Sequence, residues 1–337
     1  MNILLNCPLK FDLKSQYNNK LGGIESLNIE LAKILNKKKF NVTISSECKK
    51  EIKINKILNL PINTIIKKRN KFNFDYIISS NDAKIFKYFR NVKKIIWLHN
   101  KLQIEKAIRK RQLISIIKSN SIAVFVSNFL EKNTSNLYLF KKRIVINNFI
   151  THHFLTKKIN YNRKPIFVWS IQREKGLDQV IDIWIKNVFS KSNTPKFYIY
   201  GTNKFPSKKK IIFYKSKNIF FKGRVNKLTL KKIYTTSMGM ICPGYDETFC
   251  LNAIEANACG LPVITFGYTA LKELIINDFN GYIVKNYNQL SQKINFMVNT
   301  NDNNRKKLIN NSFRYSKKFN INNIILKWLS ILKLPNY

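Results

Sequence analysis

The chain has 337 residues, 45% of them apolar, which is enough for two domains that each bury a core of their own. Basic residues outnumber acidic ones by 61 to 18, and the resulting formal charge of +43 attracts phosphate on nucleotides, nucleic acids or anionic lipids. No run of 18 apolar residues is present, which argues against a membrane-spanning helix, and the five scattered cysteines argue against a disulfide framework and a structural zinc site.

The positive charge is spread evenly along the chain. Residues 1–160 contain 32 basic and 9 acidic residues, and residues 161–337 contain 29 and 9. A dedicated nucleic-acid-binding tail would make this distribution lopsided. Two interpretations stay open: compositional drift in an AT-rich genome, which also fits the abundance of Asn, Ile and Lys, and use of the charge at an anionic membrane surface.

Short runs of β-forming residues alternate with helical patterns along the first half. We expect strands at residues 2–5, 42–45, 76–79, 95–98, 123–127 and 143–146, and helices at residues 25–36, 83–89 and 105–117. The first run has no basic segment before it, so we interpret it as a strand rather than a signal peptide. Strands that alternate with helices predict a parallel sheet covered on both faces.

The same pattern restarts after a polar stretch that ends at Pro165. We expect strands at residues 166–170, 196–200, 219–222, 239–242 and 263–265, and helices at residues 176–189, 228–236, 249–258 and 287–298. The sequence therefore predicts two doubly wound α/β domains, residues 1–157 and 158–337, facing each other across a ligand-binding cleft. A last apolar-rich helix, at about residues 320–333, is expected to pack back toward the N-terminal domain.

The most informative stretch is PGYDETFCLNAIEANACGLPVITF, residues 243–266. It follows an expected strand and opens a helix near Thr248 or Phe249. The free backbone N–H groups at a helix start, together with the positive end of the helix dipole, form a ready site for a diphosphate. Glu247 lies just before this helix start and Glu255 lies inside the helix, so two carboxylates accompany the expected anion site.

Seven residues separate Glu247 from Glu255, and Gly260 and Pro262 then turn the chain into a strand. This arrangement resembles glycosyltransferase family 4 of the GT-B superfamily, the "glycosyl transferases group 1" type. The resemblance implies the GT-B fold, in which two Rossmann-like domains face each other. Residues 1–157 would then be the acceptor-side domain, and residues 158–337 would bind the nucleotide-sugar donor.

The resemblance also implies roles for individual residues. Glu255 would bind the ribose hydroxyls of the nucleotide, which suits a carboxylate because it accepts two strong hydrogen bonds from a diol. Glu247 would hold the transferred sugar, Lys175 would bind the diphosphate, and His99 would contact the reacting sugar, which makes these last three the implied catalytic residues. The remaining implied donor contacts are Gly22, Gly23, Arg173, Gly223, Arg224, Val225, Thr248, Phe249, Cys250 and Leu251.

The phosphate-binding segment departs from the family pattern. The family usually has Gly-Arg, a few residues, and then Lys-Gly, but the segment VWSIQREKGLD has Trp169 and Ser170 upstream of Lys175 and Gly176. Arg173 lies between the two pairs and is the candidate replacement for the missing arginine.

The resemblance implies a retaining transfer of a hexose-type sugar from a UDP-, GDP- or ADP-sugar to a glycan or lipid-linked acceptor. Lysine and backbone amides can neutralise the diphosphate, so we expect neither a metal nor a further cofactor. Relatives assemble surface glycans such as lipopolysaccharide, capsule or exopolysaccharide, and we expect a cytoplasmic protein with peripheral contact to an anionic membrane.

Other interpretations keep part of this picture. A sugar-nucleotide epimerase or a non-catalytic sugar-nucleotide binder would share the fold. A basic nucleic-acid-binding protein would place aromatic residues among its Lys and Arg on one surface, whereas most aromatics here fall inside strand and helix patterns, so we expect no nucleic-acid partner.

Overall fold

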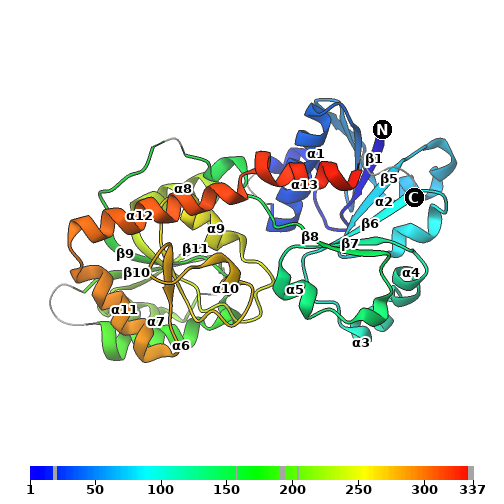
Figure 1. The fold of residues 1–337 in the computed structure, drawn as a ribbon. Coiled ribbons are helices and arrows are strands. Elements are labelled where there is room, and N and C mark those ends of the chain that lie inside the picture. The colour runs from blue at the N-terminus through cyan, green and yellow to red at the C-terminus, as the bar shows by residue number, and fades with distance from the viewer. Residues whose placement is uncertain (18–20, 157, 190–193, 203–204, 333–337) are drawn as a thin grey trace. The chain divides into compact units, whose positions relative to one another are not determined.

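The computed structural model describes residues 1–17, 21–156, 158–189, 194–202 and 205–332. The chain divides into two compact units. The first unit contains Met1–Phe149 together with the chain from Ile321 onward, and the second contains Ile150–Asn320. Each unit is an α/β structure built on one sheet (Figure 1).

The described part of the first unit has an eight-stranded sheet in the order β3-β4-β2-β1-β5-β6-β7-β8. Its pairings are parallel apart from the antiparallel pair β3–β4. The strands are β1 Asn2–Asn6, β2 Asn41–Ser46, β3 Ile52–Ile54, β4 Ile57–Pro61, β5 Tyr76–Ser80, β6 Lys93–Leu98, β7 Ile122–Phe125 and β8 Lys142–Val145. Buried apolar residues along β1, β5, β6 and β7 form the centre of this core.

The helices of the first unit are α1 Gly23–Lys37, α2 Ile62–Lys67, α3 Ile104–Arg109, α4 Leu113–Ile117, α5 Asn128–Lys132 and α13 Ile321–Leu332. Helix α13 is amphipathic and buries Trp328, whose ring meets Trp97 edge to face at 5.0 Å between centroids. This contact joins the end of the chain to the core around β6. Across the described ranges, no helix has the length and apolar character needed to cross a membrane.

Three parts of the first unit differ from the sequence prediction. Strands β3 and β4 form a hairpin that was not predicted, because its turn uses Asn55 and Lys56, both at positive φ, instead of a glycine. The single helix expected at residues 105–117 is two short helices, since Arg111 has a φ of 52° and interrupts the helical backbone. The helix expected at residues 83–89 is a short 3-10 helix, Lys84–Tyr88.

The described part of the second unit has a six-stranded, wholly parallel sheet in the order β11-β10-β9-β12-β13-β14. The strands are β9 Lys164–Trp169, β10 Lys196–Tyr200, β11 Ile219–Gly223, β12 Ser237–Ile241, β13 Val263–Thr265 and β14 Gly281–Ile283. The helices are α6 Leu177–Ile183, α7 Lys208–Ser216, α8 Lys227–Thr236, α9 Leu251–Ala258, α10 Leu271–Leu274, α11 Tyr287–Asn299 and α12 Asp302–Ser316.

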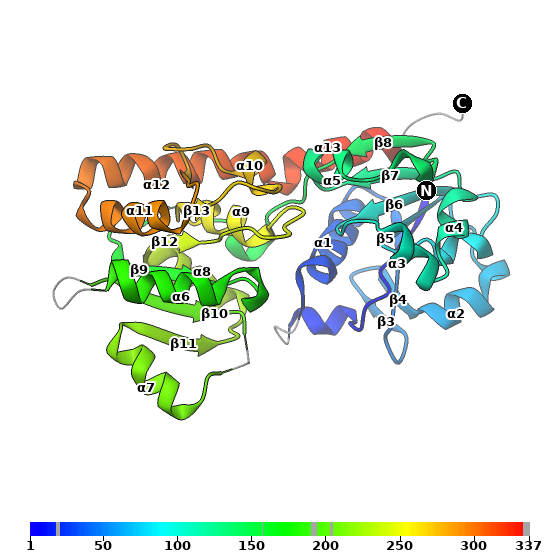
Figure 2. The same ribbon diagram turned by 90° about the horizontal axis from the view of Figure 1, so that it is seen from below.

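Helices cover both faces of this second sheet. Helices α8, α9 and α12 lie on one face, and α6, α7 and α11 lie on the other (Figures 1 and 2). This arrangement is the doubly wound architecture expected from the alternating pattern. The carboxyl ends of the neighbouring strands β9 and β12 therefore lie side by side, and each continues into a loop that carries candidate site residues.

The boundary between the units falls after Phe149 rather than between residues 157 and 158. The Ile150 amide donates to the Phe319 carbonyl at 2.9 Å, and the ring of Phe154 packs 5.8 Å from that of Tyr234 in α8. These contacts tie residues 150–154 to the second unit, although the polar composition that we interpreted as a linker begins only at Thr156.

Candidate functional site

The carboxyl end of β12 continues through residues 242–250 into α9. Gly244, Asp246 and Cys250 all have positive φ, so this loop follows a tightly folded path. Contacts to its backbone include the Thr269 hydroxyl, which donates to the Gly244 carbonyl at 2.8 Å, and the Ala270 amide, which donates to the Glu247 carbonyl at 3.3 Å. These hydrogen bonds hold the backbone of Glu247 in a fixed position.

Helix α9 begins at Leu251, so the predicted start near Thr248 or Phe249 is wrong. Cys250 has φ 68° and ψ 79°, a left-handed conformation that a right-handed helix does not accommodate. The first-turn amides of the helix therefore begin at Leu251, and Thr248 lies in the loop. The side chain of Phe249 is buried, with its ring 5.9 Å from that of Phe319, which leaves its backbone as the part that can meet a ligand.

Lys175 and Glu247 come together across the two neighbouring strand ends. Lys175 ends the 3-10 helix Arg173–Lys175 that follows β9, and its Nζ donates to the Asp246 carbonyl at 2.8 Å. The same Nζ lies 3.8 Å from Glu247 Oε1, and each side chain is 17% exposed. A half-buried cation and carboxylate are therefore held together just before α9.

Burial raises the pKa of Glu247, an effect that the positive charge of Lys175 partly opposes. Gly176 follows Lys175 with a φ of 103°, and a Cβ there would lie 2.8 Å from the ring of Tyr245. This position therefore requires glycine for both its backbone conformation and its space, which fixes the direction in which the Lys175 segment leaves β9.

Glu255 lies inside α9 with only 5% of its surface exposed. The Thr151 hydroxyl donates to its Oε1 at 3.3 Å. Burial raises the pKa of Glu255 from 4.5 to about 7, while the charge of Lys227, the first residue of α8, acts in the opposite direction. Because the pKa is raised, the ionised carboxylate disfavours the folded state progressively as the pH rises from 4.5 to about 7. Hydrogen bonds from a ligand would relieve this cost.

Sequence reasoning missed two partners of Glu255, Thr151 and Lys227. Thr151 belongs to no sequence motif, so its hydrogen bond to Glu255 could be found only in the structure. Lys227 directly follows the segment that contains Gly223, Arg224 and Val225, and that segment ends β11 and leads into α8. Gly223 has a φ of 73°, and Arg224 is exposed.

Arg173 forms an ion pair with a neighbouring acid. Its guanidinium bonds to both carboxylate oxygens of Asp178, at 2.6 and 3.3 Å. The position of the missing arginine is Ser170, whose hydroxyl lies 2.6 Å from that of Tyr234 and whose carbonyl accepts from Asn252. The ion pair with Asp178 uses Nε and Nη2 of Arg173, so the compensating role expected of this residue would fall to its remaining N–H donors.

Three candidates lie in the first unit. Gly22 is the N-cap of α1 and Gly23 is the first residue of that helix. His99 follows β6 and is 5% exposed, and its backbone amide donates to Asn81 Oδ1 at 2.7 Å. Burial lowers the pKa of His99 to about 3, so its imidazole is neutral at physiological pH.

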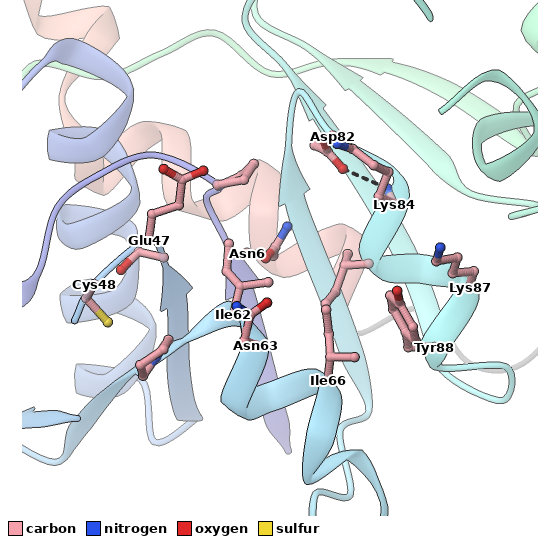
Figure 3. A pocket seen from close by; sticks show the side chains of 14 residues that line it. Asn6, Glu47, Cys48, Ile62, Asn63, Ile66, Asp82, Lys84, Lys87 and Tyr88 are labelled. Atoms are coloured by element: carbon pink, nitrogen blue, oxygen red, sulfur yellow. Dashed lines mark hydrogen bonds and ion pairs between the residues drawn. The ribbon is translucent and has the colours of Figure 1, made fainter. Parts of the chain in front are cut away.

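A pocket of about 550 Å³ opens at the carboxyl ends of β1, β2 and β4 in the first unit (Figure 3). Asn6 forms part of its floor, and Tyr88 contributes an aromatic ring to its wall. Its charged side chains are two acids and two bases: Glu47, Asp82, Lys84 and Lys87. This local balance differs from the chain as a whole, where bases outnumber acids by 61 to 18.

The pocket and His99 share one turn after β5. Asp82 lines the pocket, and the neighbouring Asn81, at a φ of 56°, accepts hydrogen bonds from the amides of His99 and Asn100. Behind them Asn6 donates to the Ser79 hydroxyl at 2.8 Å. The two features are therefore parts of one hydrogen-bonded framework at the carboxyl edge of the sheet.

The described residues contain no group of three or more His, Cys, Asp or Glu side chains suited to a metal ion. The five cysteines, all within the described ranges, are free thiols. Cys242 and Cys250 lie with their sulfur atoms 3.7 Å apart at the two ends of the loop that carries Glu247.

Residues 152–315 match the family model described as "Glycosyl transferases group 1". The matched region includes Lys175, Glu247 and Glu255. This part of the chain therefore resembles the family in the region that holds these three residues. The match confirms the group 1 resemblance predicted from the sequence.

Curated relatives and a solved structure agree with this assignment. Over 240 residues, 68% of the chain, it is 28% identical to an uncharacterized glycosyltransferase of Methanocaldococcus jannaschii. Over 253 residues it is 25% identical to the capsular polysaccharide biosynthesis glycosyltransferase CapM of Staphylococcus aureus. These matches span 65% and 63% of the relatives' own lengths.

The structure of Anabaena HepE in complex with UDP and glucose superposes with a TM-score of 0.71 at 14% identity, covering 98% of this chain and 99% of that one. At this level of identity the likeness concerns the fold. It confirms the predicted GT-B type of two Rossmann-like units.

Proposed function

We propose that the protein is a retaining glycosyltransferase of family 4, which moves a hexose-type sugar from a nucleoside diphosphate donor to an acceptor hydroxyl during assembly of a surface glycan. The observation that carries the proposal is the grouping of Lys175, Glu247 and the buried Glu255 around the N-terminus of α9. A cation, exposed helix amides and two carboxylates match the diphosphate, the ribose and the sugar of such a donor.

Each part of the donor has a partner in this arrangement. The Lys175 ammonium and the amide of Leu251 bind the diphosphate, and Glu255 accepts from the ribose hydroxyls. Glu247 accepts from the hydroxyls of the transferred sugar. Gly223, Arg224 and Val225 lie next to the base through their backbone, and Lys227 adds positive charge near Glu255.

The reaction breaks the bond between the anomeric carbon and the diphosphate oxygen, and forms a bond from that carbon to the acceptor oxygen. Negative charge grows on the departing diphosphate, where Lys175 and the amides of α9 stabilise it without a metal ion. The acceptor hydroxyl passes its proton to the leaving phosphate oxygen on the same face of the sugar, which retains the configuration. From the family resemblance we further expect roles in sugar transfer for the neutral imidazole of His99 and for the backbone at Gly22 and Gly23.

The pocket of the first unit is the acceptor site in this proposal. Its amide and carboxylate groups accept and donate to hydroxyls, and the ring of Tyr88 offers a face for a sugar to stack on. Its equal numbers of acidic and basic side chains fit an uncharged sugar better than a phosphorylated one. The shared Asn81–Asp82 turn connects this pocket with His99.

UDP-sugars are the first donors to test, because HepE was solved with UDP and glucose, and GDP- and ADP-sugars follow. CapM, a relative named for capsular polysaccharide biosynthesis, supports a surface glycan as the product. We place the reaction on the cytoplasmic side of the membrane.

A thermal-shift series with UDP-, GDP- and ADP-sugars tests the donor site. The correct nucleotide at about a hundredfold excess over its Kd should stabilise the protein by about 2.7 kcal/mol, because it binds the folded state alone. Labelled donor and an oligosaccharide mixture then separate the activities: label in a longer glycan supports transfer, whereas label in an epimeric sugar nucleotide supports an epimerase. A series without any shift would contradict the proposal.

The pKa of Glu255 gives nucleotide binding an expected pH dependence. The ionised carboxylate accepts from the ribose diol, and lowering the pH from about 8 to about 6 protonates it. The Kd for UDP should therefore rise about tenfold over this range. Calorimetric titration of the wild-type protein and of Glu255→Gln measures the effect, and the variant should lose the part of the pH dependence that does not come from the nucleotide phosphate. An identical profile for both proteins would argue against this role.

A further inference from the structure

Bulky aliphatic side chains stand exposed on three neighbouring elements of the first unit. Ile108 in α3 is 58% exposed and Ile114 in α4 is 69% exposed. Leu137 and Leu139, at the 3-10 helix Asn136–Tyr138, are 69% and 66% exposed. Helix α4 packs against both α3 and this 3-10 helix, so the three elements are neighbours, and their exposed aliphatic residues Ile108, Ile114, Leu137 and Leu139 are here called the aliphatic patch. Figure 1 shows α3 and α4 in the first unit. Apolar patches of this kind mark interaction sites.

Positive charge surrounds the aliphatic patch. Residues 104–118, IEKAIRKRQLISIIK, contain five basic residues and one acidic residue, Glu105. The basic residues are exposed: Lys106, Arg109, Lys110, Arg111 and Lys118. This ratio exceeds the chain average of 61 to 18, so the charge is concentrated where the aliphatic residues are exposed.

The leucines of the patch are held in place from behind. Tyr138, between them, is buried and its ring stacks 5.9 Å from that of Phe140. Arg143 bonds to Glu131 Oε1 at 2.7 Å and to Asn136 Oδ1 at 2.8 Å, which fixes the segment before Leu137.

Leu139 itself has φ 49° and ψ 44°, a left-handed conformation that is unfavourable for a branched side chain. Its side chain nevertheless stands in solvent. Strained residues kept by a well-determined surrounding structure cluster at functional sites. The side chain of Leu139 is thus exposed from a backbone position at the end of the 3-10 helix that the contacts behind it hold in place.

We propose that the aliphatic patch docks the protein on an anionic lipid surface. Aliphatic side chains that enter the boundary between headgroups and acyl chains, flanked by Lys and Arg that pair with anionic headgroups, are the chemistry of peripheral membrane helices. Nucleic acid is a poorer match, because bases stack on aromatic rings and the exposed members of the patch are aliphatic. Docking does not depend on the proposed transferase activity, since it needs neither donor nor acceptor.

Helix α7 of the second unit supplies a matched comparison. It exposes Ile212 and Phe213, at 70% and 49%, beside the basic residues Lys208, Lys209 and Lys210. The two apolar side chains lie on a single helix, whereas the aliphatic patch extends over three elements. If exposed apolar and basic residues alone were enough, both α7 and the aliphatic patch would bind lipid. The docking proposal assigns lipid binding to the aliphatic patch and not to α7.

Co-sedimentation of the full chain with vesicles tests the proposal. Vesicles of phosphatidylcholine with about one third phosphatidylglycerol should bind the wild-type protein, and pure phosphatidylcholine vesicles should bind it at least tenfold less. The variant Ile114→Gln/Leu137→Gln/Leu139→Asn should lose at least tenfold in partition coefficient, whereas Ile212→Gln/Phe213→Gln should bind as the wild type does. Asparagine is chosen at position 139 because it tolerates the left-handed conformation.

A second variant, Lys106→Gln/Arg109→Gln/Lys110→Gln, removes charge from exposed positions without touching the leucines. It should remove the preference for phosphatidylglycerol, and it keeps the test decisive if the leucine variant fails to fold. Three results would overturn the proposal: no binding of the wild type to anionic vesicles, equal loss from the α7 variant, or loss of a protein dimer in the leucine variant with vesicle binding unchanged.

Discussion

Replacing Lys175 with methionine should lower kcat/KM for sugar transfer by about a hundred- to a thousandfold. Its ammonium donates to the Asp246 carbonyl and lies 3.8 Å from Glu247, at the position where the departing diphosphate gathers charge. Methionine keeps the length of the side chain but removes the charge. Initial rates with a labelled nucleotide sugar measure the effect.

The control for this variant is Lys306→Met, an exposed lysine of α12 that should leave the rate unchanged. Lys175→Gln separates charge from structure, because the amide can still donate to the Asp246 carbonyl but carries no charge. It should be as slow as Lys175→Met, whereas a loop held only through that carbonyl would recover activity. If Lys175→Met retains more than a tenth of the wild-type activity, the lysine acts on loop structure and not on the diphosphate.

Replacing Arg163 with methionine should destabilise the second unit by about 3 kcal/mol or more. Its guanidinium is buried and donates to the carbonyls of Tyr234 at 2.6 Å and Cys259 at 2.8 Å, at the ends of α8 and α9. The variant leaves these buried acceptors without a donor. Differential scanning calorimetry of the whole chain should show the transition of the second unit at a temperature roughly 6–12 °C lower.

Arg314→Met is the comparison for this second prediction. Arg314 is exposed in the last turn of α12, and substitutions at such surface positions change the free energy of unfolding by about 0.5 kcal/mol or less. Equal shifts for the two variants would mean that Arg163 does not hold the helix ends together.

The alternation of strands and helices could be predicted because both sheets are parallel and their central strands are continuous apolar runs, such as Leu4 and Leu5 in β1 and Val168 and Trp169 in β9. Helix α12 was not predicted. Its sequence is rich in Asn, Lys and Arg, and its buried face consists of a few residues, Leu308, Ile309 and Tyr315 among them. A narrow apolar stripe in a polar segment gives only a weak periodic signal.

The site residues could be predicted as far as they belong to a motif. Lys175, Glu247 and Glu255 were implied by the resemblance to the family's motifs, and the structure brings Lys175 and Glu247 together. The start of α9 could not be predicted, because nothing in the amino-acid sequence indicates that Cys250 adopts a left-handed conformation.

Contacts between residues that only the folded chain brings together could not be predicted from the sequence either. The pairing of Arg173 with Asp178 depends on how residues 173–178 turn from a 3-10 helix into α6. The hydrogen bond from Thr151 to Glu255 joins positions 104 residues apart. Neither contact leaves a local pattern in the sequence.

Helix α13 follows the second unit in the chain, yet it completes the unit that contains β1. Trp328 packs on Trp97, whose ring lies 4.4 Å from that of His99 between centroids. During translation, the first unit therefore cannot complete its core until the second unit and α13 have been synthesised. The usual order, in which the N-terminal domain folds first, does not apply here. A single proteolytic cut after Phe149 would likewise yield a fragment that lacks part of its own interior, so neither half of the molecule is an autonomous product of one cleavage.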